Sequence, residues 1–212
     1  PHRGHDGHRP SLRDAAGGGL GPAIRAVRAP EPIGAHDGAV VARRGLPVPA
    51  PQENRSGALL SEVRGKPAAI VTRLDGQAVV QPTPAHCALV GDVLARMHKA
   101  GADFPLFQPH LRGIGWWKES VPKLEPHIPD DVFQRLADEL IYQDSFFRSV
   151  RFERLPAGPI HADLFRDNAL FDGGRLTGVF DFYFAGCDAL LFDIAVCLND
   201  WCVDDRTGRP VG

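Results

Sequence analysis

Three polar residues in the second half of the sequence have the types and spacing that phosphoryl transfer requires. Asp163 and Asn168 belong to one segment, 161–168 (HADLFRDN), and Asp181 follows a short apolar stretch farther along. Phosphoryl transfer needs a carboxylate that accepts or orients the acceptor hydroxyl, and oxygen ligands for the Mg²⁺ that neutralises the phosphates. A loop with this spacing can direct Asp163 at the acceptor and Asn168 at the metal. Asp181 can reach the same metal from a neighbouring strand end.

The alternative is that these carboxylates only cap loops. An unpaired carboxylate at the end of an apolar strand is costly unless a cation or donor lies nearby, which favours a functional role for Asp181. The pair Gly173-Gly174, between Phe171 and Leu176, predicts a tight hairpin that returns the chain to the loop.

Two features near the N-terminus give weaker signals. Gly17 to Gly19, followed by Gly21, could bind phosphate only with a strand before them, and the preceding residues predict none. The spacing of His2, His5 and His8 lacks a carboxylate or Cys cluster that would complete a metal site. We interpret both as parts of a coil.

The overall charge excludes some classes of partner. The chain has 24 Lys and Arg against 26 Asp and Glu, a net charge of −2. We therefore expect a small-molecule substrate and neither nucleic acid nor membrane as a partner. The sequence has no apolar run of about 18 residues and no secretory signal, so we also expect a soluble, cytoplasmic protein. The oligomeric state is not predicted.

Composition divides the chain near residue 42. Residues 1–41 contain no aromatic residue, Lys or Met and follow no apolar period. After residue 42, apolar segments alternate with turn signals. They predict a hairpin of Ala58–Val63 and Ala68–Arg73, a strand-loop-strand-turn-strand order over 158–181, and helices over Pro84–Lys99 after the N-cap Thr83, Trp116–Leu124, Asp130–Phe147 and Leu190–Trp201.

The segment 161–168 resembles the catalytic loop of the aminoglycoside and choline phosphotransferase family, and Asp181 matches the metal-binding Asp after the hairpin of that family. The resemblance implies an α+β, protein-kinase-like fold with two lobes, and ATP and Mg²⁺ as cofactors. It implies Asp163 as catalytic base, His161 as a catalytic residue that supports the loop backbone, Asn168 and Asp181 as Mg²⁺ ligands, and Asp193 as the residue that steadies the loop. For Asp193, an ordinary Asp at a helix N-terminus is an equally good interpretation.

Within this family, four segments are most similar to homoserine kinases: 161–168, 181–183 (DFY), 199–202 (NDWC) and 43–49 (RRGLPVP). The similarity implies transfer to the hydroxyl of L-homoserine, a step towards threonine. It places the hinge that meets adenine at Ile70, Val71, Thr72, Arg73 and Leu74. Asp200, Trp201 and Tyr183 are the substrate candidates, because a carboxylate can pair with the ammonium of homoserine and an indole can form a pocket wall. The alternative for Trp201 is an ordinary core residue.

The resemblance covers residues from about 42 to the C-terminus. We therefore expect residues 1–41 to be disordered or out of frame, 42–75 to be a remnant of the N-terminal lobe and hinge, and 76–212 to form the catalytic lobe. In this interpretation the N-terminal lobe is largely missing or scrambled and the C-terminal helices are truncated. Two other functions stay open: a kinase of the same fold for choline or an aminoglycoside, and an inactive fragment that keeps the motifs.

Overall fold

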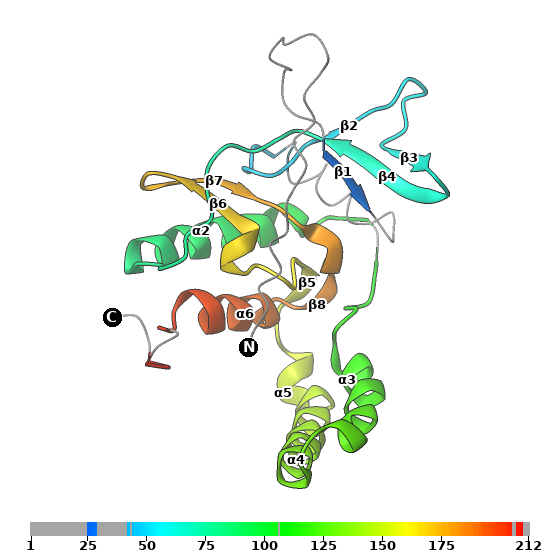
Figure 1. Ribbon diagram of the computed structural model, residues 1–212, viewed down its shortest axis with the longest axis vertical. Helices are drawn as coiled ribbons and strands as arrows, with labels where there is room; N and C mark the ends of the chain where they lie inside the picture. Colours follow the sequence, from blue (N-terminus) through cyan, green and yellow to red (C-terminus); the bar gives the residue numbers. More distant parts are fainter. Residues whose placement is uncertain (1–24, 29–41, 43, 106, 205–206, 210–212) are drawn as a thin grey trace, which may run out of the picture.

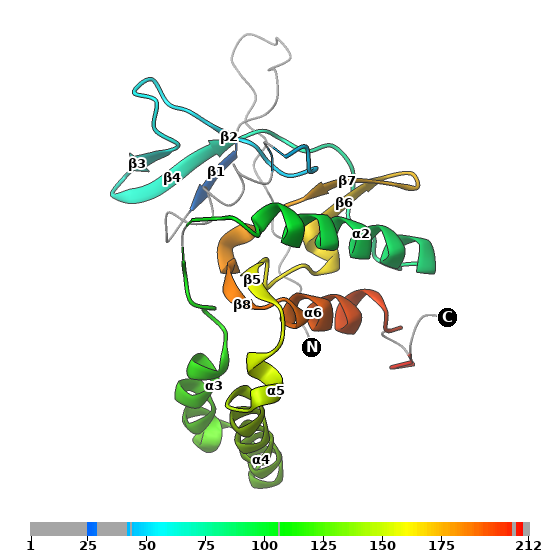
Figure 2. The same ribbon diagram turned by 180° about the vertical axis from the view of Figure 1, so that it is seen from behind.

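The computed structural model describes residues 25–28, 42, 44–105, 107–204 and 207–209 (Figure 1). An antiparallel sheet lies at one end, a layer of helices and short strand pairs lies in the middle, and a unit of helices lies at the other end. The same order is seen from behind in Figure 2. This mixture of strands and helices agrees with the expected α+β class.

Strand β4 (Lys66–Val71) is the centre of the sheet, and it pairs antiparallel with β2 (Pro51–Gln52) and β3 (Leu60–Val63). The turn between β3 and β4 contains Arg64 and Gly65, with φ of 54° and 73°. Two positive φ angles suit the twist of a two-residue hairpin. The predicted hairpin is confirmed, with slightly shorter strands than expected.

A fourth strand, β1 (Arg25–Arg28), lies in the segment for which no element was expected. It pairs with β4, with Arg25 opposite Val71 and Arg28 opposite Ala68. Main-chain pairing with a sheet edge needs no apolar pattern, so the composition of residues 1–41 did not predict it. The glycines 17–21 and the histidines 2, 5 and 8 lie outside the described residues.

The middle layer contains the predicted catalytic segment. Helix α2 (Pro84–Gly101) begins at the expected cap. The Thr83 hydroxyl accepts the backbone N–H of His86, and the His86 ring accepts the backbone N–H of Thr83. The other elements of this layer are β5 (Ala157–Ile160), β6 (Ala169–Asp172), β7 (Arg175–Val179), β8 (Gly186–Ala189) and α6 (Leu191–Trp201).

The main hydrophobic core lies between α2, the hairpin β6–β7 and α6. It includes Val90, Val93, Leu94 and Met97 from the buried side of α2, together with Leu164, Phe171, Val179 and Trp201. Leu164 belongs to the predicted catalytic segment itself and is fully buried. Burial of this side chain fixes the loop onto the helices beneath it.

The helical unit consists of α3 (Ile114–Ser120), a 3₁₀ helix (Val121–His127), α4 (Asp130–Phe147) and α5 (Val150–Glu153). The expected helix over Trp116–Leu124 begins earlier and changes to 3₁₀ geometry at Val121, next to Pro122, a residue type that cannot donate an interior helix hydrogen bond. Helix α4 has the predicted bounds. Within the described part of the chain, no helix combines the length and apolarity needed to cross a bilayer.

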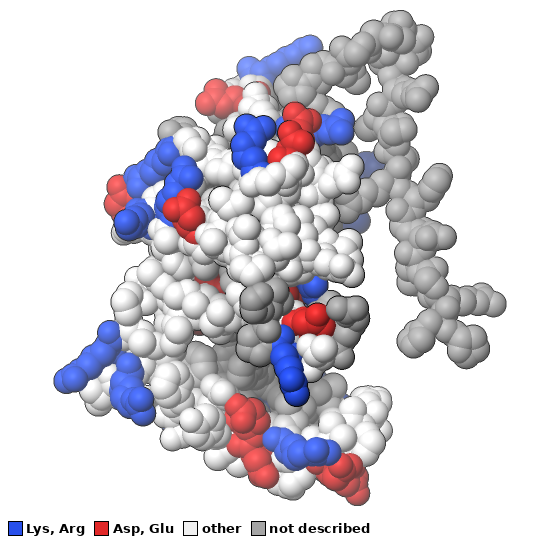
Figure 3. Space-filling model, turned by 90° about the vertical axis from the view of Figure 1, so that its left-hand side faces the viewer, with Lys and Arg blue, Asp and Glu red and all other residues white. Residues whose placement is uncertain are grey.

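The described surface carries charges of both signs. On the face shown in Figure 3, Lys and Arg side chains are interspersed with Asp and Glu, and a broad uncharged area separates the charged groups. This distribution agrees with the near-neutral net charge of the sequence.

Candidate active site

The segment 161–168 forms a loop between β5 and β6, and a buried carboxylate holds its first turn. Asp193, near the start of α6, is fully buried and accepts the backbone N–H of His161 at 2.8 Å and of Ala162 at 2.7 Å. His98 of α2 bonds to the same carboxylate through Nε2 at 2.8 Å. Ala162 adopts φ of 64°, a left-handed conformation that is unfavourable outside glycine. The two hydrogen bonds that Asp193 accepts therefore fix a backbone turn that would otherwise be unfavourable.

His161 is the first residue of this loop, and its imidazole side chain is buried. Its Nδ1 accepts the backbone N–H of Asp163 at 3.3 Å, and its Nε2 lies 3.1 Å from the carbonyl oxygen of Phe180. Burial lowers the pKa of His161, which favours the neutral ring. A neutral imidazole can make both contacts at once, so the ring joins the loop to the strand that leads to Asp181.

Asp163, Asn168 and Asp181 come together at the surface of the middle layer. The side-chain amide of Asn168 donates to the carbonyl oxygen of Asp163 at 2.8 Å and to its carboxylate at 3.1 Å. Asp181 follows β7 and adopts φ of 70°. The backbone N–H of Phe180, the residue before Asp181, donates to the carbonyl oxygen of Asn168 at 3.0 Å, which places Asp181 next to the loop.

The pKa of Asp163 is raised to about 6. Partial burial is the largest cause, and the negative charge of Asp181 adds to it, while the hydrogen bond from Asn168 acts in the opposite direction. A carboxylate with this pKa is ionised at neutral pH and is a stronger base than an ordinary Asp. It is therefore suited to accept a proton from a hydroxyl group.

The same residues fit a hard divalent cation. In the described residues no three His, Cys, Asp or Glu side chains converge as a metal cluster. The available donors are the carboxylate of Asp181, the amide oxygen of Asn168 and the neighbouring carboxylate of Asp163. Oxygen ligands of this kind, with room for water and phosphate, are typical of Mg²⁺ sites.

An open pocket of about 510 Å³ lies beside Asp163 and is lined also by Phe165, Arg166, Asp167 and Asp200. Asp200, one of the predicted substrate residues, is among these lining residues. One oxygen of the Asp200 carboxylate accepts the backbone N–H of Arg166 at 2.6 Å and the side-chain Nε–H of Arg166 at 3.3 Å. The Arg166 Nη1 also donates to the carbonyl oxygen of Val80 at 3.0 Å.

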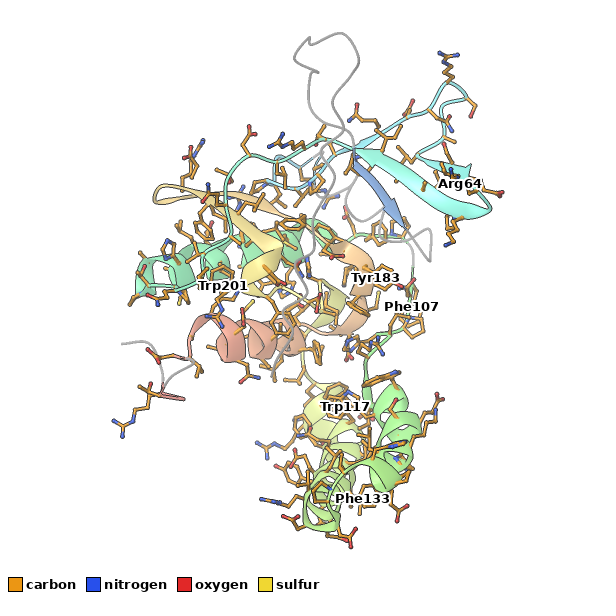
Figure 4. The ribbon with its side chains drawn as sticks, in the orientation of Figure 1. Arg64, Phe107, Trp117, Phe133, Tyr183 and Trp201 are labelled. Atoms are coloured by element: carbon orange, nitrogen blue, oxygen red, sulfur yellow. The ribbon has the colours of Figure 1, made fainter. Side chains whose placement is uncertain are left out.

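Trp201 does not line this pocket, which corrects the prediction that its indole forms a pocket wall. The side chain is fully buried in the core, and its Nε1 donates to the carbonyl oxygen of Leu164 at 3.0 Å. Figure 4 shows Trp201 among the side chains between α2 and α6. The alternative interpretation, a core tryptophan, is the correct one. Its hydrogen bond makes it a further support of the loop.

Tyr183, the third substrate candidate, is 41% exposed and lies edge-on against Phe184. It belongs to the short helix after Asp181, on the side from which the chain descends to the helical unit (Figure 4). Tyr183 is therefore separate from the lining residues of the pocket beside Asp163.

The predicted hinge, Ile70 to Leu74, leaves the sheet at the end of β4 and crosses to the hairpin β6–β7. Thr72 is fixed to Ala50, whose backbone N–H donates to the threonine hydroxyl at 2.9 Å. Leu74 lies directly over Gly178, where an added Cβ would come within 2.5 Å of a leucine methyl carbon. The segment therefore joins the sheet to the middle layer through close contacts.

Sequence reasoning missed several residues at the site. Arg166 and Asp167 belong to the motif 161–168, yet the motif by itself indicated no role for them, although both line the pocket. His98 and Arg112 are distant in sequence and carry no local signal. His98 supports Asp193, and Arg112 affects the titration of Asp163. Only folding brings them to the site.

The site and fold have clear relatives among known proteins. A family model described as "Phosphotransferase enzyme family" matches residues 38–209. Proteins described as homoserine kinases are 51% identical in Polaromonas naphthalenivorans, over 80% of this chain and 54% of the relative, and 52% identical in Paraburkholderia xenovorans, over 77% and 52%. The chain spans about half the length of the curated relatives it matches.

Solved structures resemble the fold at lower identity. An amicoumacin kinase in complex with AMP-PNP, Ca²⁺ and Ami superposes with a TM-score of 0.60 at 23% identity, covering 79% of this chain and 52% of that one. An aminoglycoside phosphotransferase from Alicyclobacillus acidocaldarius gives 0.60 at 16% identity, covering 84% and 61%. A choline/ethanolamine kinase family protein from Mesorhizobium loti gives 0.54 at 17%, covering 80% and 54%. These similarities confirm the expected protein-kinase-like fold.

Proposed function

Because the chain belongs to the phosphotransferase enzyme family, we propose that its site transfers the terminal phosphoryl group of ATP to the side-chain hydroxyl of L-homoserine, a step towards threonine. Identities of about 51% to relatives described as homoserine kinases support this acceptor. The observation that carries the proposal is Asp163, with a raised pKa, bonded to Asn168 on a loop that Asp193 holds, with the residue before Asp181 bonded to the same loop.

Asp163 is the proposed base. Its carboxylate orients the acceptor hydroxyl and takes its proton as the new bond to phosphorus forms. Asn168 holds the carboxylate through one amide hydrogen, which leaves the amide oxygen for a cation. His161 and Asp193 act through the backbone of the loop, because they fix the turn on which Asp163 stands.

Asn168 and Asp181 are the proposed Mg²⁺ ligands. A bound Mg²⁺ would neutralise charge on the phosphates and orient them for in-line transfer. The amicoumacin kinase was solved as a complex with AMP-PNP and Ca²⁺, which supports nucleotide and divalent-cation use in this fold. For the nucleotide base, we propose the backbone of Ile70 to Leu74 (Ile70, Val71, Thr72, Arg73 and Leu74) as the contact with adenine.

The acceptor is proposed to occupy the space beside Asp163. Asp200 lines the pocket there, and its carboxylate is a candidate partner for the ammonium group of homoserine. Tyr183 lies outside that pocket, exposed on the short helix after Asp181, and is a second candidate contact for a substrate that extends beyond the pocket. The near-neutral charge and the small pocket support a small soluble substrate; a cytoplasmic location is part of the same proposal.

The test is transfer by the 212-residue chain with ATP and Mg²⁺. Release of ADP is followed in a coupled assay, and the product is identified by ³¹P NMR with homoserine, choline or an aminoglycoside as acceptor. Phosphohomoserine formed by the wild type and lost in Asp163→Asn supports the proposal. Transfer to choline or the aminoglycoside, without transfer to homoserine, would show that homoserine is not the acceptor. Nucleotide binding without any transfer would favour the inactive-fragment alternative.

A further inference from the structure

Two cysteines that are far apart in the sequence meet where the start of α2 lies beside the end of α6 (Figure 1). The thiol of Cys87, in the first turn of α2, donates to the carbonyl oxygen of Trp201 at 3.1 Å. This oxygen belongs to the peptide group that leads to Cys202. Both cysteines are half-buried free thiols, and both pack against the main hydrophobic core.

The hydrogen bond brings the side chain of Cys202 within reach of the Cys87 sulfur. Across a trans peptide, the carbonyl oxygen and the following Cα are about 2.8 Å apart, so the Cys87 sulfur lies within roughly 6 Å of the Cys202 Cα. A cysteine sulfur extends about 2.8 Å from its own Cα, so the two sulfurs can come into contact by side-chain rotation. A disulfide of about 2.05 Å then needs only a small further shift.

The other two cysteines have different surroundings. Cys197 is buried, and its thiol lies 3.8 Å from the carbonyl oxygen of Leu164. Cys187 belongs to β8, where its backbone N–H donates to the carbonyl oxygen of Gln108 at 2.7 Å. The geometry therefore favours one pair of thiols.

We propose that Cys87 and Cys202 form a reversible disulfide, which fastens the end of α6 to the start of α2 at the edge of the pocket beside Asp163. Asp200, two residues before Cys202, lines that pocket and accepts the backbone N–H of Arg166 at 2.6 Å. The bond therefore fixes the part of α6 that holds Asp200. The inference does not depend on the acceptor or on phosphoryl transfer.

The oxidant is a low-molecular-weight disulfide such as oxidised glutathione. The Cys202 thiolate attacks one sulfur of this disulfide, which forms a mixed disulfide and releases one glutathione thiolate. Cys87 then loses its proton to solvent, attacks the Cys202 sulfur and releases the second glutathione. Two electrons pass from the protein thiols to the oxidant. Cys202 makes the first attack because the proton of Cys87 is held in the bond to the Trp201 carbonyl.

The test is equilibration of the full 212-residue chain with mixtures of reduced and oxidised glutathione. Samples are quenched in acid, unfolded and alkylated, and their peptides are mapped by mass spectrometry. We expect a Cys87–Cys202 disulfide as the main product, free thiols at Cys187 and Cys197, and reversal by dithiothreitol. Half-oxidation of the folded chain should occur in a buffer roughly tenfold or more reducing than in urea, because folding holds the two sulfurs together.

Three variants complete the design. Cys87→Ser and Cys202→Ser should each lose the disulfide, and Cys87→Ser should accumulate the mixed disulfide on Cys202. A serine hydroxyl at position 87 can still donate to the Trp201 carbonyl, so the local fold is kept. Cys187→Ser is the matched control and should form the disulfide in the same buffer as the wild type. Circular dichroism checks that each variant is folded.

Urea unfolding gives a second measurement. A bond between residues so distant in sequence restricts the unfolded chain, so the oxidised protein should unfold at higher urea than the reduced protein. Four results would overturn the inference: four free thiols in the most oxidising buffer, a main disulfide that involves Cys187, Cys197 or a second chain, a pair that forms as readily in urea as in the folded chain, or a lower urea midpoint after oxidation.

Discussion

Replacing Asp163 by Asn should make the metal-free protein more stable while it removes the proposed base. The pKa of Asp163 in the folded chain is about 6, against an ordinary value of 3.8, because burial and the charge of Asp181 disfavour ionisation. The exposed Asp167 adds to this effect, and Asn168 and Arg112 oppose it. The folded state thus binds the proton more tightly than the unfolded state. The free energy of unfolding must therefore fall as pH rises from about 4 through about 6.

The magnitude follows from the size of the shift. A difference of about two pKa units corresponds to at most about 3 kcal/mol. Asp163 is only half-buried, so solvent screening reduces the expected cost to about 1 kcal/mol. The uncharged amide of Asn avoids this cost, and its oxygen can still accept the hydrogen bond from Asn168. The same change should lower phosphoryl transfer about 10²- to 10⁴-fold, because the base is lost.

Urea unfolding in EDTA-containing buffer measures the difference. The free energy of unfolding of Asp163→Asn should exceed that of the wild type by about 1 kcal/mol near pH 7.5 and equal it near pH 4. Asp75→Asn, at an exposed position just after the hinge segment, serves as the matched control and should show no such gain. A variant that is less stable than the wild type near neutral pH, or whose gain persists unchanged in acid, would refute the reasoning.

Two further changes test the support of the loop and its surroundings. Asp193→Asn replaces one acceptor oxygen by a donor, which then faces the backbone N–H groups of His161 and Ala162. The change should therefore lower the free energy of unfolding by about 3 to 5 kcal/mol. An unchanged urea midpoint would contradict this. Burial raises the pKa of Cys197 to about 12, and partial burial together with the neighbouring Cys202 thiol raises that of Cys87 to about 11, so both thiols should resist iodoacetamide near pH 8 until urea unfolds the chain. Mass spectrometry measures the labelling, and rapid labelling of either thiol in the folded chain would count against these raised pKa values.

Local signals in the sequence were sufficient for the regular elements. Helix α4 has the predicted bounds Asp130–Phe147, and α2 begins after the Thr83 cap. The β3–β4 hairpin forms around Arg64 and Gly65. Each of these depends on neighbours within a few residues, through apolar period, capping or turn geometry, so the sequence contains the necessary information.

The predicted catalytic segment depends on local spacing as well, because its residue types lie close together in the chain. Asp163 and Asn168 share one loop, and a single hairpin returns the chain to Asp181. For Asp193, the sequence left two interpretations equally open. The structure decides between them, because the Asp193 carboxylate accepts two backbone N–H groups of the loop at 2.7 and 2.8 Å.

Other features depended on contacts between distant segments. Strand β1 forms by pairing with the edge of β4, and no pattern within residues 25–28 requires it. Trp201 was a plausible pocket wall by sequence, but the packing of α6 against α2 and the loop places its indole in the core. The segment before α3 lies against Gly186 of β8, a contact between distant parts of the chain that no local pattern indicates. Sequence periodicity specifies which side of an element is apolar, whereas the element it meets is decided by tertiary packing.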